Sequence, residues 1–231
     1  MGRLNPDKIV VFTGAGISAE SGIPTFRGKD GLWRGIDPML AASIDALERD
    51  PELVMEFYSE RFAGVRNAEP NAAHLAVTEL ENDFEVIVIT QNVDDLHERA
   101  DSSNVIHLHG CMTEVRAMGT TEPVHQRGLE PLKIGDVDEH GRQLRPNIVL
   151  FGEAMMHGEL ASEHLSTAGR VLVIGTSLAV YPAAGLLTDA RRDAEKVLIA
   201  HEVETLPRGF RFMRGNATHL VPQITAEWRR Q

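Results

Sequence analysis

Three polar side chains that could bind a nucleotide sugar come directly after an apolar run of this 231-residue chain. Gln91, Asn92 and Asp94 follow the run 84–90 (FEVIVIT), which predicts a buried strand with these residues at its carboxyl end. Amide and carboxylate groups at such an end can hold ribose hydroxyls and a carboxamide. Asn92 or Asp94 could instead cap a helix by accepting backbone N–H groups. The spacing alone favours the helix cap.

One histidine, His109, ends a later apolar run that begins at Val105. Imidazole titrates near neutral pH, so a histidine at the end of a strand is a natural general base for a reaction at that edge. The chain has ten histidines, and spacing alone favours a structural, hydrogen-bonded role for any one of them. His107, on the same strand face, is the structural alternative. The pattern therefore makes His109 a candidate base without deciding its role.

A glycine-containing loop, Gly14–Ser18 (GAGIS), follows the first apolar run of the chain. Glycines there let the backbone turn sharply and approach a pyrophosphate, and a following helix would offer N–H groups to the anion. A tight strand–helix turn explains a bare GxG equally well. The loop continues as GAGISAESGIPTFR over 14–27, where Gly22–Pro24 interrupts the expected helix. Phe26 and Arg27 could then shield a reactive ribose carbon and contact a phosphate.

An alternation of strands and helices must position these residues. Short apolar runs predict buried strands at 8–13, 84–90, 105–108, 147–151, 170–174 and 196–200. Helical spacing lies between them at 73–80, and Pro182 could begin another helix. This order predicts a doubly wound, parallel, Rossmann-like α/β sheet. Gly175, Thr176 and Ser177 follow the fifth run, where small residues and hydroxyls suit a ribose or a phosphate.

Two segments break the alternation and predict a smaller lobe inserted into the sheet domain. Residues from Gly28 to about Asn71 have the pattern of a loop followed by helices. Residues from Cys111 to Pro146 are polar, rich in Gly, Pro and His, and poorly periodic. We therefore expect one domain, 1–231, in two lobes. The large lobe would comprise approximately 1–27, 72–110 and 147–231, and the small lobe approximately 28–71 and 111–146.

The composition excludes several classes of protein. A formal net charge of −11 argues against a nucleic-acid binder, which would carry a basic face, and allows basic peptide partners. The single cysteine, Cys111, rules out a disulfide within the chain and fits a reducing compartment. No apolar stretch has the length of a membrane span or of a signal sequence, so we expect a cytoplasmic protein without a membrane partner.

The segment GAGISAESGIPTFR resembles the NAD-binding signature of the sirtuins, which are NAD-dependent protein deacylases. Four further segments match this family in the right order: TQNVDDLHERA (90–100), HLHG (107–110), NIVLFGE (147–153) and GTSLAVYPAA (175–184). The resemblance covers nearly the whole chain, and five ordered motifs are too specific for a chance match. It implies an enzyme that uses NAD⁺ to remove acyl groups from the lysines of proteins or peptides.

The resemblance assigns roles to individual residues. His109, directly before the glycine of HLHG, corresponds to the catalytic base. The acyl oxygen of the substrate would attack the ribose carbon that carries nicotinamide, and His109 would activate a ribose hydroxyl, giving lysine, nicotinamide and O-acyl-ADP-ribose. Sirtuins usually have asparagine where this chain has His201. The implied NAD contacts are Gly14, Ala15, Gly16, Ser18, Ala19, Pro24, Thr25, Phe26, Arg27, Trp33, Gln91, Asn92, Val93, Asp94, Gly175, Thr176, Ser177, His201, Glu202, Val203 and Ala217.

The acyl-lysine site is implied by the segment NIVLFGE. Val149, Phe151, Gly152 and Glu153 would form an exposed backbone edge, to which an extended substrate peptide could add as a strand. An ordinary buried strand would explain the same apolar residues. We therefore expect these four residues to bind the substrate because of the family resemblance, and not because of their pattern.

Two residues on a predicted helix, Pro51 to about Val65, bear on the choice of acyl group. Tyr58 and Arg61 lie three apart and so share a face, and a surface pair, with Arg61 bonded to a nearby acid, is the simplest explanation. Tyr-x-x-Arg here also resembles the sirtuin class that prefers succinyl, malonyl or glutaryl lysine. Such groups end in a carboxylate, which Arg can bind bidentately and Tyr can hydrogen-bond. We therefore expect succinyl and malonyl substrates, with acetyl as a further one.

The sequence departs from the family where most sirtuins hold a structural zinc ion with two cysteine pairs. Ala117 stands about where the first zinc cysteine is expected, and Cys111 is the only cysteine of the chain. Cys111, His125, Asp136 and His140 together match no zinc spacing. We therefore expect NAD as the cofactor and no bound metal ion.

Two other functions fit the same NAD signature. A loosened small lobe could admit water or another nucleophile, which would give NAD glycohydrolysis or ADP-ribosyl transfer. A non-enzymatic ADP-ribose-binding module is the other alternative. A binding module needs no base, however, and this chain keeps both His109 and Asn92, so the deacylase interpretation is favoured.

Overall fold

The computed structural model describes residues 3–25, 37–122 and 124–230, and it places six parallel strands in one sheet. In chain order they are β1 (Asn5–Thr13), β2 (Glu85–Thr90), β3 (Val105–His107), β7 (Ala168–Ile174), β8 (Glu195–Ala200) and β9 (Arg211–Arg214). Across the sheet their order is β3-β2-β1-β7-β8-β9. The winding changes direction between β1 and β7, which is where ligands bind in such sheets. The predicted doubly wound sheet is confirmed.

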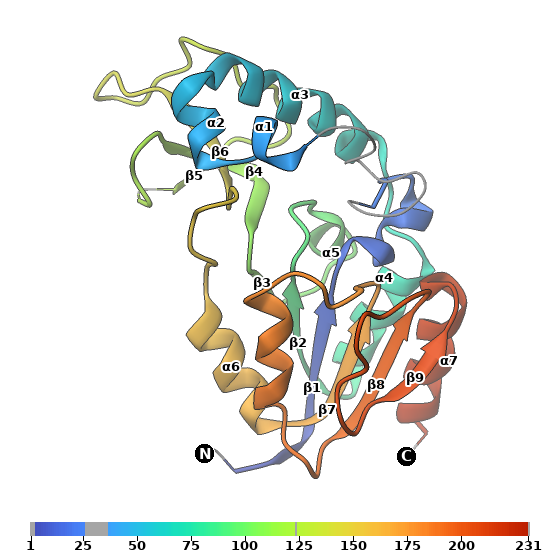
Figure 1. Ribbon diagram of the computed structural model, residues 1–231. Coiled ribbons are helices and arrows are strands. Elements are labelled where there is room, and N and C mark those ends of the chain that lie inside the picture. Colours follow the sequence, from blue (N-terminus) through green and yellow to red (C-terminus); the bar gives the residue numbers. More distant parts are fainter. Residues whose placement is uncertain (1–2, 26–36, 123, 231) are drawn as a thin grey trace.

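Both faces of this sheet are apolar because helices cover each of them. Ile9 and Val11 of β1 pack with α4 (Ala72–Glu79) and α7 (Ala217–Trp228). Val10 and Phe12 face the other way, toward α6 (Gly158–Thr167) and the 3-10 helix η4 (Ala183–Asp189). Figure 1 shows α6 and α7 on opposite sides of the sheet. Burial on both sides explains why the strands stand out in the sequence as continuous apolar runs.

A second, antiparallel sheet and three helices lie beyond the carboxyl ends of the parallel strands (Figure 1). The sheet consists of β4 (Gly110–Ala117), β5 (Val124–Gln126) and β6 (Leu144–Ile148). The helices are α1 (Pro38–Ala41), α2 (Ile44–Arg49) and α3 (Pro51–Asn67). We call these six elements the small lobe. Met112 and Ile148 of its sheet share one apolar cluster with Phe62 of α3.

Helix α3, which carries Tyr58 and Arg61, has its start encoded in the sequence. The side chain of Asp50 accepts a hydrogen bond from Leu53 N at 3.1 Å, and Pro51 occupies the first turn, where its missing N–H costs nothing. With 17 residues, α3 is the longest helix among the described residues. Among all the residues that the structure describes, no helix is both long and apolar enough to cross a membrane.

Two expected elements differ in the structure. The run 147–151 does not join the parallel sheet: its first two residues end β6, which begins at Leu144 and pairs with β4. Apolar character predicted a strand there but could not specify its partner. The helix expected after Pro182 is the 3-10 helix η4, and a further short 3-10 helix, η3 (Leu80–Asn82), follows α4.

Candidate active site

Two glycine-containing turns meet at the carboxyl edge of the parallel sheet. Gly14 N–H donates to Ile174 O, and Gly16 N–H donates to Gly175 O at 2.8 Å. A Cβ on Gly16 would lie 2.7 Å from the Gly175 backbone, and one on Gly175, whose φ is +65°, would lie 2.3 Å from Ile17 N. The close approach of the turns after β1 and β7 therefore requires glycine at both positions.

The loop after β1 does not continue into the regular helix that we expected. It forms two single-turn 3-10 helices, η1 (Ala15–Ile17) and η2 (Ala19–Ser21), which end at Gly22 with a left-handed φ of +90°. Asn71 at the start of α4 fixes the loop, because its Nδ2 donates to Ile17 O at 2.8 Å and to Ser21 Oγ at 2.9 Å. We did not predict this role, although an Asn directly before helical spacing is a capping signal.

Ser18 and two polar residues that follow β2 form a buried hydrogen-bonded group. Ser18 Oγ donates to Asp94 Oδ2 at 3.0 Å and accepts from Asn92 Nδ2 at 3.2 Å. Asp94 Oδ1 also accepts from Leu96 N, the first residue of α5 (Leu96–Arg99), whose N-cap residue is Asp95. Burial raises the pKa of Asp94 to about 6, against the opposing effect of its hydrogen bonds. The carboxamide oxygen of Asn92 is buried without a hydrogen-bond partner in the described structure.

His109 lies two residues beyond the end of β3. Its Nδ1 is 2.9 Å from Gln91 O, and because a carbonyl only accepts, Nδ1 carries the proton and Nε2 keeps the lone pair. Burial lowers the pKa of His109, and the bond to Gln91 offsets this only in part. The imidazole is therefore neutral at pH 7 and able to accept a proton. The Gln91 side chain donates to Thr176 Oγ1 at 3.3 Å, which links this site to the turn after β7.

His107 has the opposite electrostatic setting. Its Nε2 is 2.7 Å from the carboxylate of Glu98, and its Nδ1 is 3.0 Å from Asn92 O. Burial lowers the pKa of His107, but the hydrogen bond and charge of Glu98 outweigh it, so the pKa is raised above its ordinary value. With both ring nitrogens bonded to acceptors, His107 has the geometry of a structural histidine.

Two threonines and two histidines support this edge from inside, and we did not predict any of them from the sequence. Thr13 Oγ1 donates to Thr90 Oγ1 at 2.8 Å and lies 3.1 Å from His97 Nε2. Thr90 Oγ1 in turn accepts from Asn92 N at 3.0 Å. The rings of His74 and His97 meet edge to face with centroids 5.0 Å apart. The only signal in the sequence was that a threonine ends each of the two apolar runs 8–13 and 84–90.

The residues expected near the adenosine lie at the ends of β8 and α7. His201, Glu202 and Val203 directly follow β8, and the first two are exposed. Ala217 is buried at the start of α7. Glu20 of η2, which sequence reasoning missed, joins this region to the glycine loop. Its carboxylate accepts from Asn216 Nδ2 at 2.8 Å and from Thr218 Oγ1 at 2.7 Å.

The rest of the signature loop is described only in part. Ala19 and Pro24 are exposed, and Thr25 is half-buried. The expected contacts Phe26, Arg27 and Trp33 lie outside the described residues. On the other side of the site, Val93 O accepts from Met112 N at 2.8 Å and so connects the cofactor edge to the small lobe.

The segment 149–153 is not the open backbone edge that we expected. Val149 N–H donates to His109 O at 2.8 Å, Phe151 N–H donates to Ala42 O at 2.8 Å, and Glu153 N–H donates to Leu150 O at 2.9 Å. Residues 42–44 already take the place of an added strand, because Ile44 N–H also donates to Phe151 O. These N–H groups are therefore paired within the chain, and the assignment of the segment to the substrate stays a prediction. The Phe151 side chain remains 44% exposed.

The carboxylate of Glu153 is bound by two buried arginines. Arg145 Nη1 and Nη2 donate to its two oxygens at 2.8 and 3.0 Å, and Arg116 Nη2 donates at 3.0 Å. Burial raises the pKa of Glu153, but these hydrogen bonds and charges outweigh it and lower the pKa overall. Glu153 thus bridges Arg116 of β4 and Arg145 of β6 within the small lobe, and its assignment to the substrate stays a prediction.

Tyr58 and Arg61 lie together on α3. Tyr58 is buried in the small-lobe cluster, and burial raises the pKa of its hydroxyl well above the usual value. Arg61 is half-buried; Nη1 donates to Phe57 O, and the guanidinium carbon lies 3.1 Å from the centroid of the Phe57 ring. Arg61 forms no ion pair with a described acid, so the surface pairing considered above is not seen in this part of the chain.

Two of the four residues considered for zinc have other contacts. Cys111 is buried with its Sγ 3.1 Å from Thr113 Oγ1, and Asp136 accepts from Arg127 Nη2 at 2.8 Å. Within residues 3–25, 37–122 and 124–230, no group of three or more His, Cys, Asp or Glu side chains is placed to hold a metal ion.

Comparison with known proteins identifies the family. Residues 14–182 match the model of the Sir2 family. The chain belongs to the Sir2 family. The "NAD-dependent protein deacylase" of Helicobacter pylori (strain ATCC 700392 / 26695) is 43% identical over 218 residues, covering 94% of this chain and 95% of the relative. The protein of the same name from Pyrococcus furiosus is 41% identical and covers 96% and 93%.

Solved structures of Sir2 proteins have the same fold. A Sir2 homolog–NAD complex superposes with a TM-score of 0.86 at 40% identity, covering 96% of this chain and 90% of that one. A Sir2–p53 peptide–NAD⁺ complex gives 0.77 at 30% identity and covers 96% and 94%. The sirtuin resemblance drawn from the five motifs is thereby confirmed.

Proposed function

We propose that this Sir2-family protein is an NAD-dependent protein-lysine deacylase. The observation that carries the proposal is the geometry of His109, whose Nδ1 lies 2.9 Å from Gln91 O, so that Nε2 is the nitrogen available to accept a proton. The names of its relatives and the ligands of its structural neighbours support the same activity.

The residues at the carboxyl edge fit NAD. Asn92 is 2% exposed, and its carboxamide oxygen has no donor among the described residues. A buried amide oxygen without a hydrogen bond is costly, and a hydroxyl or amide donor of a bound dinucleotide would remove that cost. Ser18 and Asp94 hold the other end of the Asn92 side chain in place. We therefore assign Asn92, Gln91 and Ser18 to the NAD site, with the turns at Gly14–Gly16 and Gly175–Ser177.

The chain's contribution to the reaction is positioning and proton transfer. When bound, NAD⁺ supplies an activated ribose carbon with nicotinamide as its leaving group. Nε2 of His109 accepts a proton from a ribose hydroxyl, and Gln91 O then stabilises the imidazolium through Nδ1–H. The depressed pKa of His109 keeps the base unprotonated before the transfer. The hydrogen bond from Gln91 to Thr176 keeps the segment after β2 aligned with the turn after β7 during this step.

Acidic acyl groups are the proposed preferred substrates, with acetyl as a further one. Arg61 is a half-buried cation without a described carboxylate partner, and its Nε is buried without a hydrogen bond. Burial lowers the pKa of Arg61, and the neighbouring Tyr58 acts in the opposite direction, so the two groups influence each other electrostatically. A succinyl or malonyl carboxylate would give Arg61 the counter-ion that it lacks, in exchange for its contact with Phe57 O.

One assay tests the activity. The purified chain is incubated with one lysine peptide in acetyl and succinyl forms, with and without NAD⁺, and products are followed by mass spectrometry. We expect NAD-dependent deacylation, and a loss of turnover of about 10²–10⁴-fold in His109→Ala with NAD affinity largely kept. His125→Ala, an exposed histidine of β5, is the matched control. Nicotinamide release with both peptides intact would instead support glycohydrolysis or ADP-ribosyl transfer.

A second assay tests the acyl preference. Arg61→Met keeps the length of the side chain and removes its charge, and Tyr58→Phe removes only the hydroxyl. We expect each to lower kcat/KM for the succinyl peptide by about tenfold or more and to leave the acetyl peptide within about twofold. Equal losses on both peptides would show that the two residues only stabilise the small lobe.

A further inference from the structure

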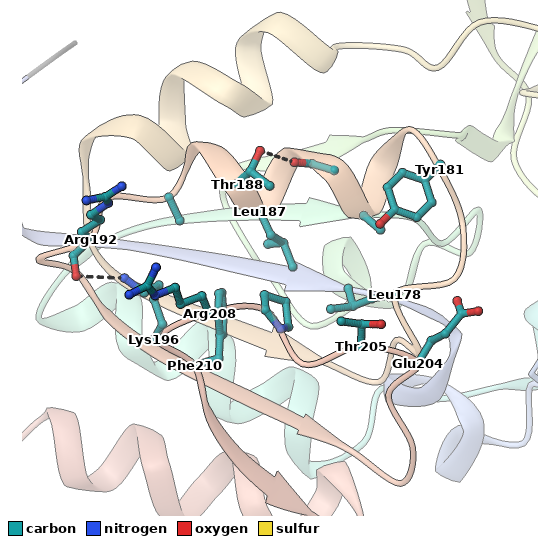
Figure 2. A pocket seen from close by; sticks show the side chains of 15 residues that line it. Leu178, Tyr181, Leu187, Thr188, Arg192, Lys196, Glu204, Thr205, Arg208 and Phe210 are labelled. Carbon is teal, nitrogen blue, oxygen red and sulfur yellow. Dashed lines mark hydrogen bonds between the residues drawn. The ribbon is translucent and has the colours of Figure 1, made fainter.

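A pocket of about 790 Å³ lies between η4 and the segment 204–210 that leads into β9. Its floor is aliphatic and aromatic: Leu178, Leu187 and Phe210 are buried side chains of the same core cluster. This volume is typical of sites for small organic ligands. Figure 2 shows these side chains between η4 and the opposing segment. The pocket takes no part in the chemistry assigned to His109.

One end of the pocket is cationic. Arg192, Lys196 and Arg208 gather there, whereas Tyr181 and Glu204 stand at the other end (Figure 2). Arg192 and Arg208 are exposed, and neither forms an ion pair with a described carboxylate. These charges gather locally in a chain whose net charge is −11.

Lys196 ties the cationic end of the pocket to the backbone of the protein. Its side chain is buried, and Nζ donates to the carbonyls of Arg191 and Arg192, the latter at 3.2 Å. It therefore fixes the turn that carries Arg192 while adding its own positive charge to the wall. Burial lowers the pKa of Lys196, which a nearby anion would counteract.

The cationic end is separate from the candidate active site. Lys196 is the second residue of β8, whereas the active site lies at the carboxyl ends of the strands. The five residues from Lys196 to Ala200 span about 13 Å of strand. Only the other end approaches the cofactor edge, where Glu204 N–H donates to Ser177 O at 2.9 Å and Leu178 N–H donates to Thr176 Oγ1 at 3.1 Å.

We propose that this pocket binds a fatty carboxylate, with its head group at Arg192 and Arg208 and its alkyl chain along the floor. Guanidinium groups match a carboxylate in charge and geometry, and the floor offers apolar surface without matching polar groups. Thr188 adds no free donor for a polar ligand, because its hydroxyl already donates to Gly185 O at 2.7 Å. The lining thus favours an alkyl chain over a sugar or base.

Decanoate titrated into the full chain by calorimetry tests this proposal. We expect saturable binding that weakens about tenfold or more in the double variant Arg192→Ala/Arg208→Ala. Gly185→Leu fills the pocket without changing its charge and should have a similar effect, since a Cβ at Gly185 meets only the Tyr181 ring at 3.7 Å. Arg230→Ala, an exposed arginine near the C-terminus, is the control and should bind like the wild type.

Two further titrations decide the site and the chemistry. Decanol and decyltrimethylammonium share the alkyl chain and should bind at least about tenfold more weakly, because they lack the negative charge. Binding of decanoate should persist with saturating NAD⁺. Competition by NAD⁺, equal binding of the three amphiphiles, or unchanged affinity in both pocket variants would each overturn the proposal. None of these readouts depends on the deacylase activity.

Discussion

The two lobes bury polar groups in different ways. At the carboxyl edge of the parallel sheet the buried groups are mostly uncharged: the Thr13 and Thr90 hydroxyls bond to each other beside the ring of His97, and the carboxyl group of Asp94 accepts from the Ser18 hydroxyl and the Leu96 N–H. In the small lobe they are charged, with Arg116 and Arg145 around the single carboxylate of Glu153. The parallel sheet has helices on both faces and is stabilised by burial of many apolar side chains. In the three-stranded sheet, the backbone pairing of β4 with β6 is supplemented by one carboxylate, Glu153, which bridges their arginines. The small lobe should therefore be the more fragile.

The largest effect should come from removing that anion. Glu153→Ala leaves Arg116 and Arg145, whose side chains are 4% and 3% exposed, without a counter-ion. It also removes the acceptor of Leu150 N–H. Breaking a buried ion pair on one side typically costs about 3–5 kcal/mol, and we expect a loss in that range in the free energy of unfolding measured with urea.

The matched control is an exposed ion pair of the same lobe. Glu130 lies 3.2 Å from Arg66 with its side chain 70% exposed, so Glu130→Ala should cost less than about 1 kcal/mol. If the two variants lose equal stability, the ion cluster around Glu153 is not what holds β4 to β6.

A smaller effect is expected at Gly110, at the junction of the lobes. Gly119, beyond the other end of β4, has the same backbone conformation and serves as the comparison. Gly110 has a φ of +76° and Gly119 a φ of +75°, so alanine meets the same left-handed strain of about 1–2 kcal/mol at each. A Cβ on Gly110 would also lie 1.9 Å from Asn147 O, whereas Gly119 has open space. We expect Gly110→Ala to cost about 3 kcal/mol in the same unfolding assay. Equal losses would mean that the junction relaxes freely.

The same contrast explains what the sequence predicted. Strands buried on both faces, such as β1 and β7, stood out as apolar runs. Asn92 and His109 were found because they come after the runs that contain β2 and β3. Short β9 has charged ends and gave no run. Arg116 lies 37 residues from Glu153, so no local pattern could reveal their pairing. Glu153 was assigned to the substrate because of the family resemblance, and its pairing with Arg116 was not anticipated.

Acid should affect the two lobes in different pH windows. Burial lowers the pKa of His74 to about 4, below its ordinary 6.5. The unfolded chain therefore takes up the proton first, and this contribution to stability is complete above pH 6.5 and lost as the pH falls toward 4, about 3 kcal/mol in total. The pKa of Glu153 is lowered from 4.5, so its contribution is present above pH 4.5 and is lost only as the pH falls through the folded value.

His74→Gln isolates the first of these windows. Glutamine at the third helix position can accept the hydrogen bond from Asn71 N that His74 Nδ1 now accepts, and it does not titrate. Unfolding free energies at pH 7, 5.5 and 4.5 should fall less steeply in this variant than in the wild type. The difference between the two proteins is the measure, because the raised pKa of Asp94 acts with the opposite sign. If the two profiles are parallel, folding does not lower the pKa of His74.

The smallest effect should be that of metal removal. Side chains close the turns of the segment 117–142: Asp138 Oδ1 accepts from the N–H groups of His140 and Arg142, each at 2.9 Å, and Thr120 Oγ1 donates to Ala117 O at 2.8 Å. These bonds need no ion, so excess chelator should shift Tm by less than about 1 °C, while a relative with both cysteine pairs should lose stability. A chelator-dependent fall in Tm, or one zinc per chain in the purified protein, would show that an ion holds the small lobe after all. The contribution of Glu153 to the stability of the small lobe would then be smaller than we expect, because the metal ion and the carboxylate would both link β4 to β6.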